Sequence, residues 1–219
     1  MNSVRVKRET VDYYVEEAFK SLRTNIQFCG EDKKAIAITS SIPGEGKSNT
    51  SLNLAISLSE AGKKVLFVDA DLRKSVLAGK LNMSGRTKGL THFLAKQATL
   101  QEVISSTDIP NLYLIIAGAV PPNPAELLGG KALSEMLGVA RKVYDYIIID
   151  TAPLGSVIDS AIIAERCDGA VLVVESGAVS YRLAQNMKKQ LERTNCPLLG
   201  VVLNKVDYTQ GGRYGKYGK

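Results

Sequence analysis

One glycine-rich segment constrains this chain most strongly, because it lies between an apolar run and a helical pattern. Residues 35–38 read Ala-Ile-Ala-Ile, and residues 39–48 read Thr-Ser-Ser-Ile-Pro-Gly-Glu-Gly-Lys-Ser. A strand, a glycine-rich turn and a helix starting near Gly-Lys-Ser form the setting that a phosphate-binding loop requires. The strict GxxxxGK[ST] pattern has glycine where this chain has Ser41. The alternative is a glycine-rich loop with an incidental lysine, but the order of elements favours nucleotide binding by residues 43–48.

Short apolar runs separated by helical patterns predict the fold. The runs cover residues 35–39, 64–69, 112–117, 146–150, 170–174 and 199–203. They lack polar alternation, as is typical of strands buried on both faces of a parallel sheet. Helical patterns cover residues 12–28, 49–61 and 181–194. We therefore expect an α/β fold of the P-loop NTPase type, a single doubly wound domain with a mostly parallel central sheet.

The predicted domain covers residues 1–206, and its first 30 residues include an N-terminal helix that is a possible oligomerisation element. Residues 207–219 are rich in glycine, tyrosine and cations, with no aliphatic side chain, which predicts a flexible tail.

Three aspartates follow apolar runs. Asp69 and Asp71 follow one run, and Asp150 closes another. Because ligands of open parallel sheets lie outside the carboxyl ends of the strands, we expect these carboxylates to converge on the glycine-rich loop. Lys47 would reach the β- and γ-phosphates, while the Ser48 hydroxyl and Asp150 would hold Mg²⁺. A capping or turn role is the alternative for each aspartate alone.

The composition excludes several classes of function. The chain has 219 residues, 45% of them hydrophobic, and a formal net charge of +6. This charge fits attraction to phosphates, acidic partners or an anionic membrane surface, but no DNA- or RNA-binding motif accompanies it, so we expect no nucleic-acid partner. His92 is the single histidine, which excludes a histidine-rich metal site and argues against a Ser/His/Asp triad. No apolar run approaches 18 residues, so we expect no membrane span.

The segment Asp69-Ala70-Asp71 resembles the Walker-A′ segment of the P-loop ATPases that include the MinD and ParA partition proteins. Those proteins carry a signature lysine near the start of the loop, where this chain has Ser-Ser-Ile at residues 40–42. That lysine acts across a dimer on a neighbour's nucleotide. Its absence argues against a switch of the MinD/ParA type.

A broader resemblance links the chain to the bacterial tyrosine kinases of capsular and exopolysaccharide synthesis, the CpsD/CapB-like group. It covers nearly the whole sequence, through residues 39–48, 68–73, 122–128 and 149–153 and the tyrosine-rich end. The resemblance implies an ATP-dependent protein-tyrosine kinase that phosphorylates its own C-terminal tyrosines. A MinD/ParA-like ATPase switch that binds a membrane or scaffold partner stays open as the alternative, as does a non-catalytic, ATP-sensing adaptor.

The same resemblance implies roles for individual residues. Asp69 would be the base for the incoming tyrosine, Asp71 would join Ser48 and Asp150 at the metal, and Lys47 would serve catalysis. The residues expected at the nucleotide are Pro43, Gly44, Glu45, Gly46, Lys47, Ser48, Asn49 and Asn204. The expected phosphate acceptors are Tyr208, Tyr214 and Tyr217. A solubilising tail without a substrate role is the alternative for these tyrosines.

The resemblance also implies partners. The family's Glu-x-x-Arg-x-x-Arg oligomerisation motif appears here as Glu17, Lys20 and Arg23, with lysine in place of the first arginine. That replacement keeps the charge but loses a bidentate fork. We expect a homo-oligomer, possibly a ring, a membrane-anchored activator and an opposing tyrosine phosphatase. The expected location is the cytoplasm, with recruitment to the inner face of the cell membrane by a partner.

Overall fold

A single sheet organises the chain in the computed structural model, which describes residues 3–6, 12–77 and 88–207. Its strands are β1 (Ser3–Val4), β2 (Ala35–Ser40), β3 (Val65–Asp69), β4 (Ser105–Thr107), β5 (Leu112–Ile115), β6 (Tyr146–Asp150), β7 (Gly169–Glu175) and β8 (Leu198–Asn204). Their order across the sheet is β1-β4-β5-β3-β6-β2-β7-β8. All neighbouring pairs are parallel except β4 and β5. The predicted α/β fold with a mostly parallel sheet is therefore confirmed.

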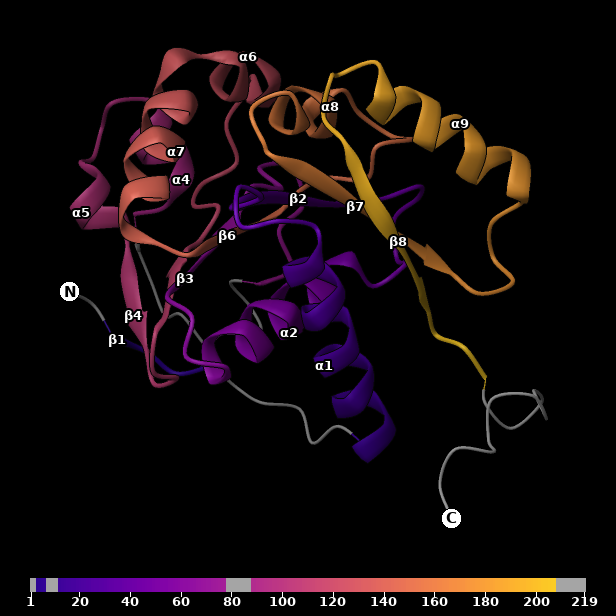
Figure 1. Ribbon diagram of the computed structural model, residues 1–219. Helices are drawn as coiled ribbons and strands as arrows, with labels where there is room; N and C mark the ends of the chain where they lie inside the picture. The colour runs from indigo at the N-terminus through magenta and orange to yellow at the C-terminus, as the bar shows by residue number, and fades with distance from the viewer. Residues whose placement is uncertain (1–2, 7–11, 78–87, 208–219) are drawn as a thin grey trace.

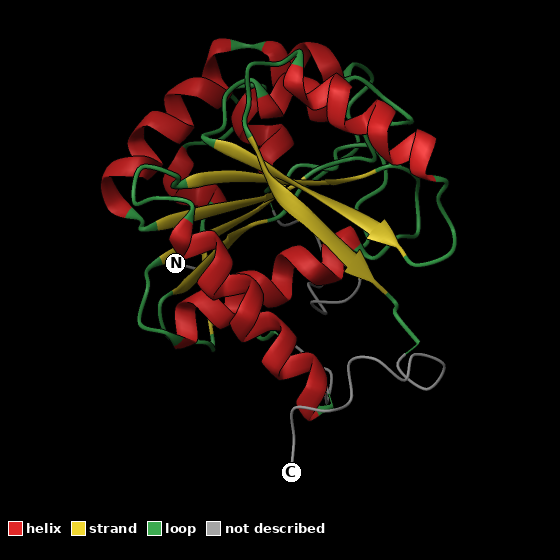
Figure 2. Cartoon of the chain, turned by 45° about the vertical axis from the view of Figure 1, so that its right-hand side comes forward, coloured by secondary structure: helices red, strands yellow, loops and turns green. Residues whose placement is uncertain are grey.

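The helices among the described residues cover both faces of this sheet (Figures 1 and 2). They are α1 (Tyr13–Phe28), α2 (Lys47–Glu60), α4 (Leu90–Leu94), α5 (Leu100–Val103), α6 (Pro124–Gly129), α7 (Lys131–Val143), α8 (Asp159–Ala164) and α9 (Tyr181–Glu192). In Figure 1, α1 and α2 lie on one face, while α6 to α9 lie on the other.

Two apolar clusters fill the spaces between the sheet and these layers. In β2, the alternating side chains of Ala35 and Ala37 join one cluster, and those of Ile36 and Ile38 join the other. Because the side chains of a strand point alternately to opposite faces, a continuous apolar run contributes side chains to both clusters. Every residue of β2, β3 and β6 is buried. This double burial explains why these strands lack polar alternation in the sequence.

The topology brings the ends of the three central strands together. β6 lies between β3 and β2, and Asp69 pairs in register with Asp150. The phosphate loop (residues 41–48) follows β2, so it begins at the same edge of the sheet. No helix in the described ranges is long and apolar enough to cross a membrane.

Candidate active site

The conformation of the phosphate loop depends on two glycines. Gly44 has φ = 92° and Gly46 has φ = 90°, in the left-handed region that favours glycine. A β-carbon on Gly46 would also lie 2.1 Å from Asn204 Nδ2. Ser41 occupies the position where the strict pattern has glycine, but it does not adopt a positive φ. The departure from the pattern therefore places no strain on the backbone.

The buried carboxylate of Glu45 stabilises the conformation of the phosphate loop. Its side chain is fully buried, and its two carboxylate oxygens accept hydrogen bonds from the Ile42 N–H (2.8 Å) and the Glu175 N–H (3.0 Å). The first bond closes the loop on itself, and the second ties the loop to the end of β7. Glu45 was predicted at the nucleotide, but its carboxylate is engaged in these structural bonds. A nucleotide contact at this position would use the backbone.

The end of β8 holds the other side of the loop. Asn204 Nδ2 donates to the Glu45 carbonyl (2.8 Å), and Lys205 Nζ donates to the Gly44 carbonyl (2.9 Å). Lys205 also forms an ion pair with Glu175 at 2.8 Å. Asn204 therefore lies at the phosphate loop, and the contact with the nucleotide that the family resemblance implies for it stays a prediction. The roles of Lys205 and Glu175 carried no sequence signal, because both depend on contacts across the fold.

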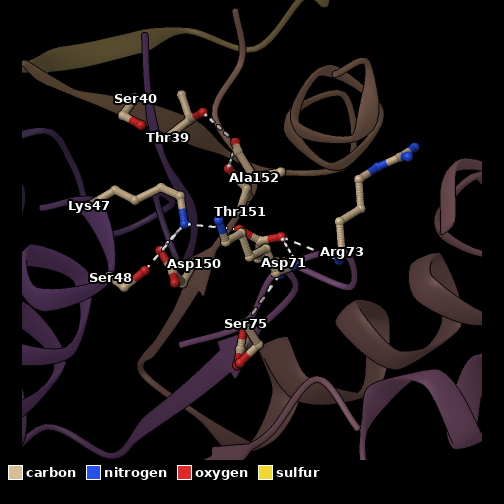
Figure 3. A network of polar contacts seen from close by, with 12 residues as sticks. Thr39, Ser40, Lys47, Ser48, Asp71, Arg73, Ser75, Asp150, Thr151 and Ala152 are labelled. Atoms are coloured by element: carbon tan, nitrogen blue, oxygen red, sulfur yellow. Dashed lines mark hydrogen bonds and ion pairs between the residues drawn. The ribbon is translucent and has the colours of Figure 1, made fainter. Parts of the chain in front are cut away.

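Lys47 joins the phosphate loop to the carboxylates at the strand ends (Figure 3). Its Nζ lies 3.2 Å from Asp71 Oδ2, 3.7 Å from Asp150 Oδ1 and 3.2 Å from Ser48 Oγ. The structure thus brings together four residues that the sequence placed at the site. An ammonium group held by carboxylates at this loop is positioned to meet phosphate oxygens.

Asp150 provides an oxygen suited to a cation. Its side chain is almost completely buried, and its Oδ1 accepts no hydrogen bond from the described residues. Burial raises the pKa of this carboxyl, while the positive charge of Lys47 opposes the rise. No group of three or more acidic, histidine or cysteine side chains in the described ranges could hold a metal ion unaided. Carboxylate and hydroxyl oxygens suit Mg²⁺, which commonly completes its coordination with water and substrate phosphates.

Asp69 differs from its neighbours because no cation among the described residues pairs with it. Its Oδ2 accepts a hydrogen bond from the Ser75 hydroxyl, and its Oδ1 accepts one from the Asp71 N–H at 3.3 Å. Burial first, and then the negative charge of Asp150, raise the pKa of Asp69 to about 7. A buried carboxyl that titrates near neutrality is suited to accept a proton from a substrate hydroxyl.

A bidentate ion pair fixes the segment that follows Asp71. Arg73 Nε and Nη2 donate to the two carboxylate oxygens of Asp159, at 2.7 and 2.9 Å. Asp159 is fully buried in the first turn of α8, so the pair ties the loop after β3 to the helix after β6. The sequence placed Arg73 beside the acidic segment, but nothing local pointed to Asp159.

Other predicted residues lie further from this centre or outside the described residues. Glu17 and Lys20 form an exposed ion pair with each other at 2.7 Å. Arg23 reaches α2 instead, where its Nη1 donates to the Ser57 carbonyl at 2.9 Å. Pro43 is exposed in the phosphate loop, and Asn49 is exposed in the first turn of α2. The predicted acceptors Tyr208, Tyr214 and Tyr217 lie outside the described residues.

Comparison with known proteins identifies relatives along most of the chain. A family profile described as an AAA domain matches residues 33–195. The tyrosine-protein kinase CpsD of Streptococcus agalactiae is 46% identical over 206 residues, which cover 93% of this chain and 90% of CpsD. The tyrosine-protein kinase YwqD of Bacillus subtilis is 38% identical over 204 residues, covering 92% of this chain and 86% of YwqD.

Comparison with solved structures points to the same family. The kinase domain of the Escherichia coli tyrosine kinase ETK superposes with a TM-score of 0.85 and 31% identity, covering 93% of this chain and 80% of that one. MinD from Pyrococcus horikoshii, solved with Mg-ADP, has a lower TM-score of 0.68 at 28% identity, covering 82% of this chain and 72% of MinD. The chain therefore belongs to the P-loop family of bacterial tyrosine-protein kinases that includes CpsD, which is related in structure to the MinD ATPases.

Proposed function

We propose that this chain is an ATP-dependent protein-tyrosine kinase that phosphorylates its own C-terminal tyrosines and regulates capsular or exopolysaccharide synthesis. The observation that carries the proposal is the pairing of two different centres at one edge of the sheet. Lys47, Ser48, Asp71 and Asp150 form a phosphate and cation centre, while Asp69 beside them has no cation partner among the described residues. Hydrolysis of ATP by water needs the first centre, and transfer to a tyrosine hydroxyl benefits from the second.

In this proposal each residue of the site has a separate role in phosphate transfer. The loop N–H groups and Lys47 bind the phosphates of ATP, and Ser48, Asp71 and Asp150 hold Mg²⁺. When bound, the metal offsets charge on the transferred phosphate. Asp69 accepts the proton of the tyrosine hydroxyl, which ordinarily titrates near pH ~10 and needs a base at neutral pH. The support for the metal ligands is the buried Asp150 oxygen, which accepts no hydrogen bond from the described residues.

The proposal for partners rests on family membership rather than on contacts within the chain. In this proposal the chain works on a membrane-bound polysaccharide assembly through a docking partner. We place the chain in the cytoplasm, recruited to the membrane by an anchored activator and opposed by a tyrosine phosphatase. Glu17 and Lys20 are available on the exposed surface of α1 for self-association, whereas Arg23 is engaged with α2.

The test is to incubate the purified chain with Mg-ATP and map phosphate by mass spectrometry. We expect phosphate on Tyr208, Tyr214 or Tyr217. Lys47→Met should abolish transfer and leave the circular dichroism spectrum unchanged, because Lys47 lies in the polar site rather than in the apolar core. Full activity in the Lys47→Met variant contradicts the assignment of this site.

A MinD-like ATPase switch is the second candidate, favoured by the structural similarity to MinD. Residues 40–42 read Ser-Ser-Ile where those ATPases carry their signature lysine, which disfavours the switch. ATP hydrolysis without any phosphotyrosine, measured in the same samples, would favour it over the kinase.

A further inference from the structure

A second tyrosine in this chain shares the surroundings of a predicted acceptor. Tyr208 stands in the tripeptide Val206-Asp207-Tyr208, and the same three residue types recur at positions 11–13, ending at Tyr13. We propose that Tyr13, at the start of α1, is a further site of phosphorylation by this kinase. The proposal rests on the kinase activity proposed above and extends it to a site near the N-terminus.

Exposure separates Tyr13 from most other described tyrosines. Tyr13 is 66% exposed and begins α1. Tyr144 and Tyr146 are 7% and 8% exposed, so neither can enter another molecule's site without unfolding. Tyr113 packs edge-on against the ring of Tyr144, with centroids 5.5 Å apart. Three of the described tyrosines are therefore held within the folded domain.

Hydrogen bonding of the hydroxyl group distinguishes among the exposed tyrosines. Tyr181 is 79% exposed, but its hydroxyl accepts a hydrogen bond from Gln185 Nε2 at 2.9 Å. The hydroxyl of Tyr13 has no hydrogen-bond partner within the described residues. Tyr14 is 72% exposed and packs edge-on against Tyr13, but it follows a tyrosine rather than an aspartate. Tyr13 alone among these combines exposure, an unengaged hydroxyl and the Val-Asp-Tyr context.

The elements next to the two tripeptides lie at the same end of the molecule. Figures 1 and 2 both show the start of α1 and the end of β8 projecting from one end of the domain. The described chain ends at Asp207, immediately before Tyr208. A second copy whose active site receives the C-terminal end of the chain therefore approaches the face that carries Tyr13.

The transfer uses the reactants of the proposed function. The Tyr13 oxygen bonds to the γ-phosphorus of ATP held by a second copy, and the bond from that phosphorus to the bridging oxygen of ADP breaks. ADP leaves, and the phenolic proton passes to Asp69 of the copy that holds the ATP. The product places about −1.5 to −2 charges in the first turn of α1, where the helix dipole stabilises anions. Within the described ranges the side chain of Asp12 makes no capping bond to this turn, whose other acidic residue is Glu16.

The test uses the full chain with Tyr208, Tyr214 and Tyr217 all changed to Phe. After incubation with Mg-ATP, tryptic digestion releases residues 9–20 as one peptide, and fragmentation distinguishes Tyr13 from Tyr14. We expect phosphate on Tyr13, its loss when Tyr13→Phe is added, and its retention when Tyr181→Phe is added instead. Mixing a Lys47→Met chain with an active Tyr13→Phe chain should place phosphate on Tyr13 of the Lys47→Met chain.

Two results overturn the proposal, and they are distinguishable from failure of the kinase. If the natural chain phosphorylates its tail but leaves the peptide of residues 9–20 unmodified, Tyr13 is not an acceptor and the kinase stands. Phosphate on Tyr14 alone overturns the argument from the tripeptide in the same way. If no tyrosine anywhere gains phosphate, the kinase and the Tyr13 site fail together.

Discussion

At the scale of single residues, Asp69 is a side chain whose environment departs strongly from that of an ordinary carboxylate. It is buried, it faces Asp150 across the β3–β6 pair, and its partners are the Ser75 hydroxyl and a backbone N–H. These surroundings disfavour its charged form and hold its pKa near 7. A proton acceptor of this kind is useful to a kinase, and it costs the folded state stability.

The effect of the buried Asp69 carboxyl on the free energy of unfolding has a definite sign and pH range. Because the pKa of Asp69 is raised on folding, its protonated form favours the folded state at low pH, and this contribution is lost as the pH rises through about 7. Asp69→Asn should abolish phosphorylation yet raise the unfolding free energy at pH ~8 by roughly 1–3 kcal/mol, with little change at pH ~4. Thermal melts without nucleotide or Mg²⁺ measure the effect.

A matched control separates burial from the simple loss of a charge. Asp32 is exposed, and Lys33 lowers the pKa of its carboxyl. Asp32→Asn should therefore give no gain in stability at alkaline pH. If Asp69→Asn behaves like Asp32→Asn across the pH range, the carboxyl of Asp69 is ionised at no cost and the account of its burial is wrong.

At the scale of elements, the phosphate loop is held in shape by its neighbours as much as by its own glycines. Gly44 and Gly46 have nearly the same φ, but only Gly46 lies against Asn204. Gly46→Ala should weaken nucleotide binding at least about tenfold more than Gly44→Ala, because it adds a clash to a similar backbone strain of about 1–2 kcal/mol. Titration calorimetry with ATP in the presence of Mg²⁺ compares the two variants.

A second substitution tests whether space is the cause. Asn204→Ala removes the amide that the new methyl group would meet, so adding it to Gly46→Ala should restore part of the lost affinity. Equal losses in the two glycine variants, with no recovery in the double variant, would show that backbone strain alone decides the affinity.

The elements that the sequence predicted are those with strong local patterns. The apolar runs of β2, β3, β6 and β7 were found because both of their flanking layers demand aliphatic side chains. The run of β8 was found as well, although its Val201 and Leu203 are exposed rather than buried on both faces. β1 (Ser3–Val4) and β4 (Ser105–Thr107) were missed, because they are short and mostly polar. The antiparallel β4–β5 pair therefore had no sequence signal either.

Which residues of the site could be recognised from the sequence also depended on whether their signal was local. Lys47, Ser48 and the three strand-end aspartates were recognisable because their neighbours in the sequence define a loop or a strand end. Supporting contacts were not recognisable, since they join residues far apart in the chain. Arg73 meets Asp159, and Glu45 meets the backbone of Glu175, only once the sheet is assembled.

At the scale of the whole molecule, charge links phosphorylation to assembly. Residues 207–219 carry the cations Arg213, Lys216 and Lys219, and the site contains buried carboxylates. Three phosphotyrosines would add roughly −5 to −6 charges to this tail. We expect the tail to be attracted to a neighbour's site before phosphorylation and repelled from it afterwards, so the oligomer should dissociate.

Light scattering before and after incubation with Mg-ATP measures this change. The mass should fall from that of an oligomer to that of a monomer, and a chain with its three tail tyrosines changed to Phe should stay assembled. An unchanged mass after full phosphorylation contradicts the mechanism. Dissociation of the Phe variant by ATP would instead point to the nucleotide itself as the trigger.

The hydrogen bonds from the end of β8 to the phosphate loop also have a consequence for when the nucleotide site forms during translation. The loop is translated early, but its holding groups on Asn204 and Lys205 are among the last residues of the domain to be made. A ribosome-bound fragment that stops before Asn204 contains every residue of the loop and lacks the groups that fix its carbonyls. The nascent chain thus completes its nucleotide site only after β8 has been translated, just before the tail tyrosines are added.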